Sequence, residues 1–104
     1  MTYDEFWLCY LRAHAKPTTR AMHYAGTLLV TLCLVLAIVN VDWRWLIAAP
    51  AIGYGFAWIA HFFLEGNRPE TFGHPLWSLI SDFRMTGLFL TGQLAKHLQQ
   101  AAVR

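Results

Sequence analysis

The segment AHFFLEGNRP, residues 60–69, stands where a long apolar run ends and a polar one begins. His61 and Glu65 are four residues apart, so on a helix both side chains lie on the same face. Gly66 suits the left-handed conformation that ends many helices, and Pro69 keeps the helix from resuming. We therefore expect an imidazole and a carboxylate to leave the end of an apolar helix together.

The composition indicates a single domain, residues 1–104, with much of its surface against lipid. Hydrophobic residues make up 57% of the chain and charged residues only 13%, about half the charged fraction of a soluble domain. A short chain cannot bury that much apolar surface in its own core. The net charge of +2 without a clustered basic stripe gives no indication of nucleic-acid binding. The two cysteines do not form a disulfide framework pattern.

Two apolar segments, residues 22–40 and 44–65, are each close to the length that crosses a bilayer. Asp42 lies in the short polar turn between them, so the pattern predicts an antiparallel transmembrane hairpin. His23 and His61 lie equally far from Asp42 along the chain. Each arm measures roughly 28 Å at the helical rise, so the hairpin returns His61 to the level of His23.

Helices are also expected on both sides of the hairpin. Residues 3–15 form a short helix with one aromatic face, which suits an interfacial position. His74 precedes Pro75 in the pattern of an N-cap and a first helical residue. A helix is predicted from there to about Gln100, and it is too polar to be a third span. The predicted fold is all-α, a small membrane helical bundle in which interfacial helices flank the hairpin.

The basic residues predict the orientation of the hairpin. Arg12, Lys16 and Arg20 precede the first span, whereas the turn at the opposite end carries only Arg44. Because positively charged residues accumulate on the cytoplasmic side of membranes, both termini and the end that carries the histidines are expected to face the cytoplasm.

Four histidines are expected at that end of the hairpin, namely His14, His23, His61 and His74. Imidazoles near a carboxylate suit a divalent transition metal, and two histidines with one carboxylate are typical of non-haem Fe(II) oxygenases. Each histidine taken alone is more often a hydrogen-bonding residue than a ligand. His97 lies outside the group and is interpreted as a solvated helix residue.

Two other classes of protein fit the same residues. One is a haem-binding membrane bundle in which His23 and His61 are the axial ligands. The other is a non-enzymatic membrane adaptor whose histidines only satisfy hydrogen bonds. Metal content and a visible spectrum distinguish the non-haem iron oxygenase, the haem-binding bundle and the adaptor from one another.

The sequence resembles the 2-hydroxy fatty acid dioxygenases of the phytosphingosine-degradation type, in their compact bacterial form. The resemblance covers nearly the whole chain. It rests on His14, Arg20, HYAG at 23–26, HFFLE at 61–65, NRP at 67–69, TF at 71–72, PLWSL at 75–79 and DFRM at 82–85.

This resemblance implies an Fe(II)-dependent membrane enzyme that uses dioxygen to shorten a 2-hydroxy fatty acid by one carbon. Within it, Glu65 and Asp82 are expected to be catalytic, either as ligands or as acceptors that orient imidazole N–H groups. Arg68 and Arg84 are expected to hold the substrate carboxylate. The acyl tail would lie in lipid or along the hairpin, and the bacterial inner membrane is the expected location.

Overall fold

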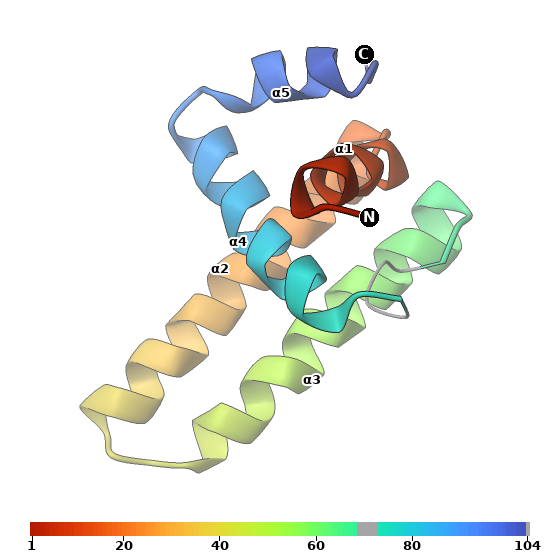
Figure 1. Cartoon of the computed structure of the whole chain (residues 1–104). Coiled ribbons are helices and arrows are strands. Elements are labelled where there is room, and N and C mark those ends of the chain that lie inside the picture. The colour runs from red at the N-terminus through yellow and green to blue at the C-terminus, as the bar shows by residue number, and fades with distance from the viewer. Residues whose placement is uncertain (69–72, 104) are drawn as a thin grey trace.

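The computed structural model describes residues 1–68 and 73–103, and the regular elements among them are all helical, which confirms the predicted all-α class. Figure 1 shows a long hairpin with the remaining helices gathered at its open end, where both termini also lie. The elements are α1 (Tyr3–Ala13), α2 (Pro17–Val39), α3 (Arg44–Ile59), the π-helix η1 (Ala60–Glu65), α4 (Pro75–Leu90) and α5 (Leu94–Gln100).

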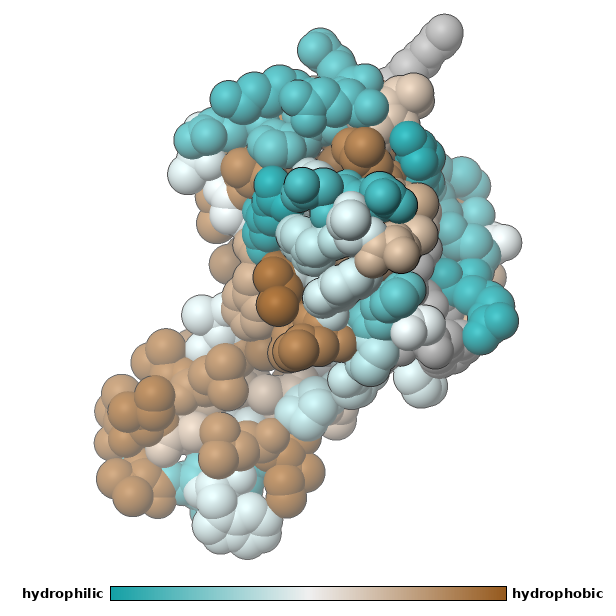
Figure 2. All heavy atoms as spheres, in the orientation of Figure 1, coloured by the Kyte–Doolittle hydropathy of each residue, from teal (hydrophilic) through white to brown (hydrophobic). Residues whose placement is uncertain are grey.

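The hairpin consists of α2 and of α3 continued by η1, joined at the predicted turn. Asp42 accepts a hydrogen bond from the backbone N–H of Arg44 at 3.1 Å and pairs with its guanidinium at 2.8 Å. The segments Pro17–Val39 and Arg44–Glu65 are long and apolar enough to cross a membrane. Large apolar side chains near the turn are exposed, and Figure 2 shows such side chains covering this part of the visible face. Which end faces the cytoplasm stays a prediction.

Small residues let the two arms of the hairpin approach each other. A Cβ added to Gly26 would lie 2.8 Å from the Cβ of Phe56, and one added to Gly53 would lie 3.0 Å from Val30. Ala49 and Ala57 are the buried residues of α3. Each of these contacts thus pairs a glycine with a larger side chain of the facing helix, and small residues of this kind are common at helix interfaces in membranes.

The main hydrophobic core lies at the open end of the hairpin, among α1, α4 and α5. Phe6, Trp7, Tyr10 and Leu11 on α1 pack with Met85 of α4 and with residues in and after α5. The side chains of Trp7 and Tyr10 are therefore buried inside the protein, whereas the sequence predicted that they lie at the membrane interface. The Thr2 hydroxyl caps this helix by accepting from the N–H of Glu5.

The predicted single helix from Pro75 to about Gln100 is wrong, because the structure divides it into α4 and α5. Gly92 adopts φ 74°, and the N–H of Gln93 donates to the carbonyl of Leu88 at 2.8 Å. This is the Schellman ending of a helix, which glycine permits because it lacks a Cβ. The break allows α5 to contact α1.

Replacing Gly26 by alanine is expected to destabilise the fold by about 1–3 kcal/mol, the usual effect of forcing a methyl group into a packed contact. Gly55→Ala is the control, because a Cβ there meets no atom within 4 Å. Thermal unfolding of both variants in detergent micelles measures the difference. Equal stability of the two variants would show that the hairpin does not require a close approach at Gly26.

Candidate metal centre

Three histidines from three different segments meet at the open end of the hairpin. His14 follows α1, His23 lies in the second turn of α2, and His61 lies in η1. One ligand atom from each ring lies within 4.8 Å of the others. All three side chains are buried, with exposed fractions of 0%, 5% and 1%. The equal arms of the hairpin thus bring His23 and His61 together as predicted, and α1 adds the third imidazole.

The ring of His14 is held by the helix that precedes it. Its Nδ1 lies 2.6 Å from the backbone carbonyl oxygen of Tyr10. A carbonyl only accepts hydrogen bonds, so Nδ1 carries the proton and Nε2 keeps a lone pair. Burial, assisted by the neighbouring His23 and His61, lowers the pKa of His14 well below its ordinary value. The neutral imidazole, the form that binds metals, is therefore favoured.

The ring of His23 is held by a carboxylate from α4. Its Nδ1 lies 3.2 Å from Asp82 Oδ1, and the same oxygen accepts a short hydrogen bond from the Tyr10 hydroxyl. Burial first, and then the Asp82 charge, raises the pKa of Tyr10 well above its ordinary value, so the phenol stays protonated and donates. His23 therefore has Nε2 as its remaining nitrogen, and this atom faces His14 Nε2 at 3.1 Å.

The ring of His61 is held by Asn67. His61 Nδ1 lies 2.7 Å from Asn67 Oδ1, and the Asn67 amide nitrogen donates to the Ala13 carbonyl at 3.0 Å. The second contact requires the amide NH₂ on that side, which leaves Oδ1 to accept the Nδ1–H of His61. The backbone N–H groups of Gly66 and Asn67 both donate to the His61 carbonyl. His61 is therefore fixed through its backbone and its ring.

The local backbone at His61 is a π-helix, which the sequence did not predict. Its wider turn replaces the α-helix on which His61 and Glu65 were expected to share a face. Single turns of π-helix occur frequently at functional sites. Gly66 ends this element with φ 77°, as the sequence predicted.

These contacts give the three rings one common arrangement. Each Nδ1 is opposite an oxygen that accepts its proton, and Nε2 is the nitrogen left on each ring. Metal-bound histidines are usually held in this way, because an acceptor behind the ring fixes both its tautomer and its orientation. The lone pairs of His14 and His23 would repel each other at their short separation without a shared cation or proton. The three histidines can therefore hold a metal ion.

Glu65 lies beside this group and has a structural contact. One carboxylate oxygen accepts from the backbone N–H of Lys16 at 3.1 Å, and the other accepts from the Thr19 hydroxyl at 3.2 Å. The negative charge thus sits at the N-terminus of α2, where the helix dipole favours it. This contact fastens the end of the second arm of the hairpin to the start of the first.

The remaining predicted site residues lie around the centre rather than within the group of three. The ring of His74 stacks on Trp77 with centroids 5.0 Å apart and meets the edge of Phe6. The guanidinium of Arg84 lies over the Trp7 ring at 4.2 Å. Arg68, which is exposed, directly follows Asn67.

His97 is not the solvated residue that the sequence indicated. Its Nδ1 accepts a hydrogen bond from the indole N–H of Trp7 at 3.2 Å, and the ring is partly buried. It therefore helps to attach α5 to α1, away from the three clustered rings.

Sequence reasoning missed three residues that organise the centre: Tyr10, Arg20 and Asn67. The buried Arg20 donates through Nη1 to the carbonyls of His14 and Ala15, both at 2.8 Å, and so holds the turn between α1 and α2. Tyr10 is four residues before His14, and Asn67 follows the helix-ending glycine. Tyr10 and Asn67 have partners far away along the chain, in Asp82 and Ala13, whereas the partners of Arg20 lie only five and six residues before it.

The fold and this cluster define a small all-helical protein with a candidate three-histidine metal centre at one end of an apolar hairpin. A family model described as 2-hydroxy-palmitic acid dioxygenase Mpo1-like matches residues 1–94. The chain therefore belongs to this family, which confirms the resemblance drawn from the sequence. Neither a curated protein nor a solved structure gave a significant match.

Asn67→Ala is expected to weaken the affinity of the centre for a divalent metal by about 10–100-fold, because the acceptor that orients His61 is lost. Asn40→Ala is the matched control, since the Asn40 amide donates to the carbonyl of Leu36 at the end of α2 farthest from the three histidines. Competition with a chelator of known affinity measures both variants. Unchanged affinity in folded Asn67→Ala protein would contradict the role of this amide.

Proposed function

We propose that this protein is an Fe(II)-dependent dioxygenase that shortens 2-hydroxy fatty acids by one carbon at a membrane. The observation that carries the proposal is the set of three buried imidazoles, each with Nδ1 opposite an acceptor and Nε2 left over. The family description supports dioxygenase chemistry and a 2-hydroxy fatty acid substrate.

The donor set fits iron. Imidazole is a good ligand for iron, zinc, copper and nickel, and among these zinc has no redox chemistry to offer dioxygen. His14, His23 and His61 would hold the metal, and the hydroxyl and carboxylate of a 2-hydroxy acid would offer it two further oxygen donors. Iron(II), when bound, would supply the electrons and the Lewis acidity that an oxidative loss of carbon requires.

The overall reaction balances without an external reductant. A 2-hydroxy acid, RCH(OH)COOH, and one O₂ give the shortened acid RCOOH, carbon dioxide and water. The bond between the carboxyl carbon and the hydroxyl-bearing carbon breaks, the latter carbon becomes the new carboxyl group, and dioxygen is reduced.

Asp82 is the carboxylate best placed to move a proton in this reaction. Its Oδ1 is occupied by His23 and Tyr10, which leaves Oδ2 to take the proton of the substrate hydroxyl. Both oxygens of Glu65 are already engaged at the start of α2. We therefore assign the catalytic role to Asp82 and a positioning role to Glu65.

We also propose that the hairpin spans a membrane, with the metal centre at one of its faces. The lengths and apolar composition of the two arms support this placement. The polar and compact part of the molecule gathers at the open end of the hairpin, as Figure 2 shows. A water-insoluble substrate could then reach the centre without leaving the bilayer.

His61→Gln is expected to remove most of the bound iron and nearly all turnover of a 2-hydroxy fatty acid, because an amide is a poorer ligand than imidazole. His97→Gln is the control, since that ring accepts a hydrogen bond from Trp7 outside the cluster. Iron per chain and product formation are measured on detergent-extracted protein whose fold is checked by circular dichroism.

Three results distinguish the competing functions. Normal iron in folded His61→Gln protein would contradict the metal role of this residue. A Soret band in the parent protein would favour haem, although ring centroids of His23 and His61 only 5.0 Å apart leave too little space for a porphyrin between them. Parent protein that binds no metal would favour the adaptor.

Arg68→Lys is expected to raise the KM for the 2-hydroxy acid about tenfold with unchanged iron content, because lysine cannot reproduce the two parallel hydrogen bonds of a guanidinium. Arg44→Lys is the control, since Arg44 pairs with Asp42 at the far end of the hairpin. Steady-state kinetics and metal analysis are measured together. Loss of iron in Arg68→Lys would show that this residue supports the centre rather than the substrate.

A further inference from the structure

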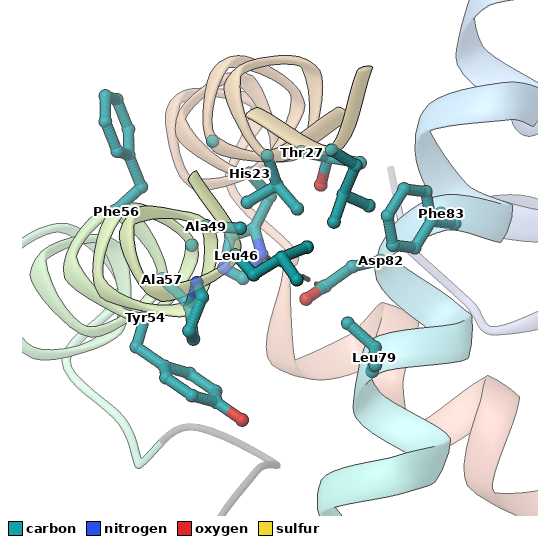
Figure 3. Close-up of a pocket in the computed structure, with 15 residues that line it drawn as sticks. His23, Thr27, Leu46, Ala49, Tyr54, Phe56, Ala57, Leu79, Asp82 and Phe83 are labelled. Atoms are coloured by element: carbon teal, nitrogen blue, oxygen red, sulfur yellow. Dashed lines mark hydrogen bonds and ion pairs between the residues drawn. The ribbon is translucent and has the colours of Figure 1, made fainter. Parts of the chain in front are cut away.

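A cavity of about 260 Å³ runs from the metal centre along the hairpin, between α2, α3 and α4. His23 and Asp82 line it at the end near the centre, and Leu34 and Leu46 line it toward the turn of the hairpin. Figure 3 shows Asp82, Leu79 and Phe83 of α4 on one side of this space, with Thr27 of α2 and Leu46 of α3 facing them. His23 and Asp82 of the candidate metal centre thus also form part of the cavity wall.

The lining changes from polar to apolar along the cavity. Beyond His23, Thr27 and Asp82, the walls are formed by side chains such as Val30, Leu46 and Phe83. A ligand that fits this gradient has one polar end and a long apolar remainder. Apolar walls with a few polar groups that fix orientation are typical of small-molecule sites.

The cavity is open along one side. Leu34, Leu46 and Leu79, which line it, have exposed fractions of 38%, 54% and 51%. Its inner wall is formed by the small residues that bring the helices together, among them Ala49 and Gly53. It is therefore a groove that an extended chain can enter sideways.

We propose that this groove, lined by His23, Val30, Leu34, Leu46, Asp82 and Phe83, binds the acyl chain of the 2-hydroxy acid and limits its length. The proposal rests on the proposed function, and it selects the hairpin rather than bulk lipid as the place of the acyl tail. The carboxylate and hydroxyl lie at the His23 end, and the methyl end lies toward the turn.

The length of the groove matches a long acyl chain. Along α2, the distance from His23 to Leu34 is about 16 Å at the rise of an α-helix. About 13 methylene groups cover that distance at the zigzag spacing of carbon–carbon bonds. With the two oxidised carbons at the head, an acid of about 15 carbons fills the groove.

Continuity with the metal centre distinguishes this occupant from a membrane lipid. A phospholipid chain would carry a phosphate headgroup to the His23 end, where the Asp82 carboxylate lines the wall. A free 2-hydroxy acid instead brings two oxygens suited to a metal and nothing bulkier. The structure therefore favours the substrate's own chain.

Photolabelling tests the location of the chain without depending on turnover. The probe is a 2-hydroxy fatty acid with a diazirine at its methyl end, added to detergent-extracted full-length protein and mapped by mass spectrometry. Labels are expected near Leu34 and Leu46, and unlabelled 2-hydroxy acid should displace them. Labels spread over the outward face of the hairpin, or labels that the unlabelled acid does not displace, would overturn the proposal.

A pair of neighbouring substitutions tests the length limit. Leu46 lines the groove, whereas the adjacent Ile47 is comparably exposed, at 61%, and does not line it. Leu46→Trp should reduce kcat/KM about tenfold or more for acids long enough to reach this position, because each methylene kept from apolar contact weakens binding about fourfold. Acids too short to reach Leu46 should be unaffected, and Ile47→Trp should keep the parent profile.

The two experiments separate failure of the groove from failure of the proposed function. Turnover by the parent protein with the same chain-length profile in Leu46→Trp and Ile47→Trp would overturn the groove alone. The proposed reaction would be overturned if the iron-loaded parent protein showed no turnover. The groove would still be supported if the parent protein carried displaceable labels near Leu46 and the Leu46→Trp variant did not. Equal labelling of the Leu46→Trp and Ile47→Trp variants would count against binding of the acyl chain in the groove.

Discussion

The candidate centre depends on the hydrogen bond at Nδ1 of each clustered histidine. A backbone carbonyl, a carboxylate and a side-chain amide hold the three rings, and each acceptor comes from a different part of the chain. Because a buried imidazole can ligate only through its unprotonated nitrogen, these acceptors decide which nitrogen is available. The surrounding contacts of Tyr10, Arg20 and Asn67 then keep the acceptors in place. The fold positions the acceptors, and the acceptors position the rings.

Two regions of the molecule, the hairpin and the group of α1, α4 and α5, each supply residues of this centre. The region of α1, α4 and α5 contains most of the hydrophobic core and supplies His14 and the Asp82 acceptor. The hairpin supplies His23 and His61, buries mainly small and polar residues, and exposes large apolar side chains. The groove that runs from the centre lies between this hairpin and α4, and small residues such as Ala49 and Gly53 form part of its wall.

Local sequence patterns predicted the features that depend on neighbouring residues. The turn at Asp42, the left-handed Gly66 and the equal arms that align His23 with His61 follow from residue type and spacing, and the structure agrees. The same approach did not recognise Gly92 as a helix end, because nothing beside it marks a stop. The contacts of Glu65, Asn67 and Asp82 were also out of reach, since their partners lie about fifty residues away along the chain. Candidate residue types can be read from a sequence, but their partners require the packing of distant segments.

The position of His14 outside the hairpin has a consequence for the folding of the protein. Two of the three imidazoles lie on the arms of the hairpin, whereas the third arrives only when α1 packs against α4 and α5. A newly made chain whose hairpin has formed but whose first helix is still undocked offers an incomplete centre. A metal ion that uses all three histidines would bind fully only after α1 has docked, and it would then stabilise that docked position. Metal binding by the three histidines would therefore be coupled to the packing of α1 against the rest of the protein.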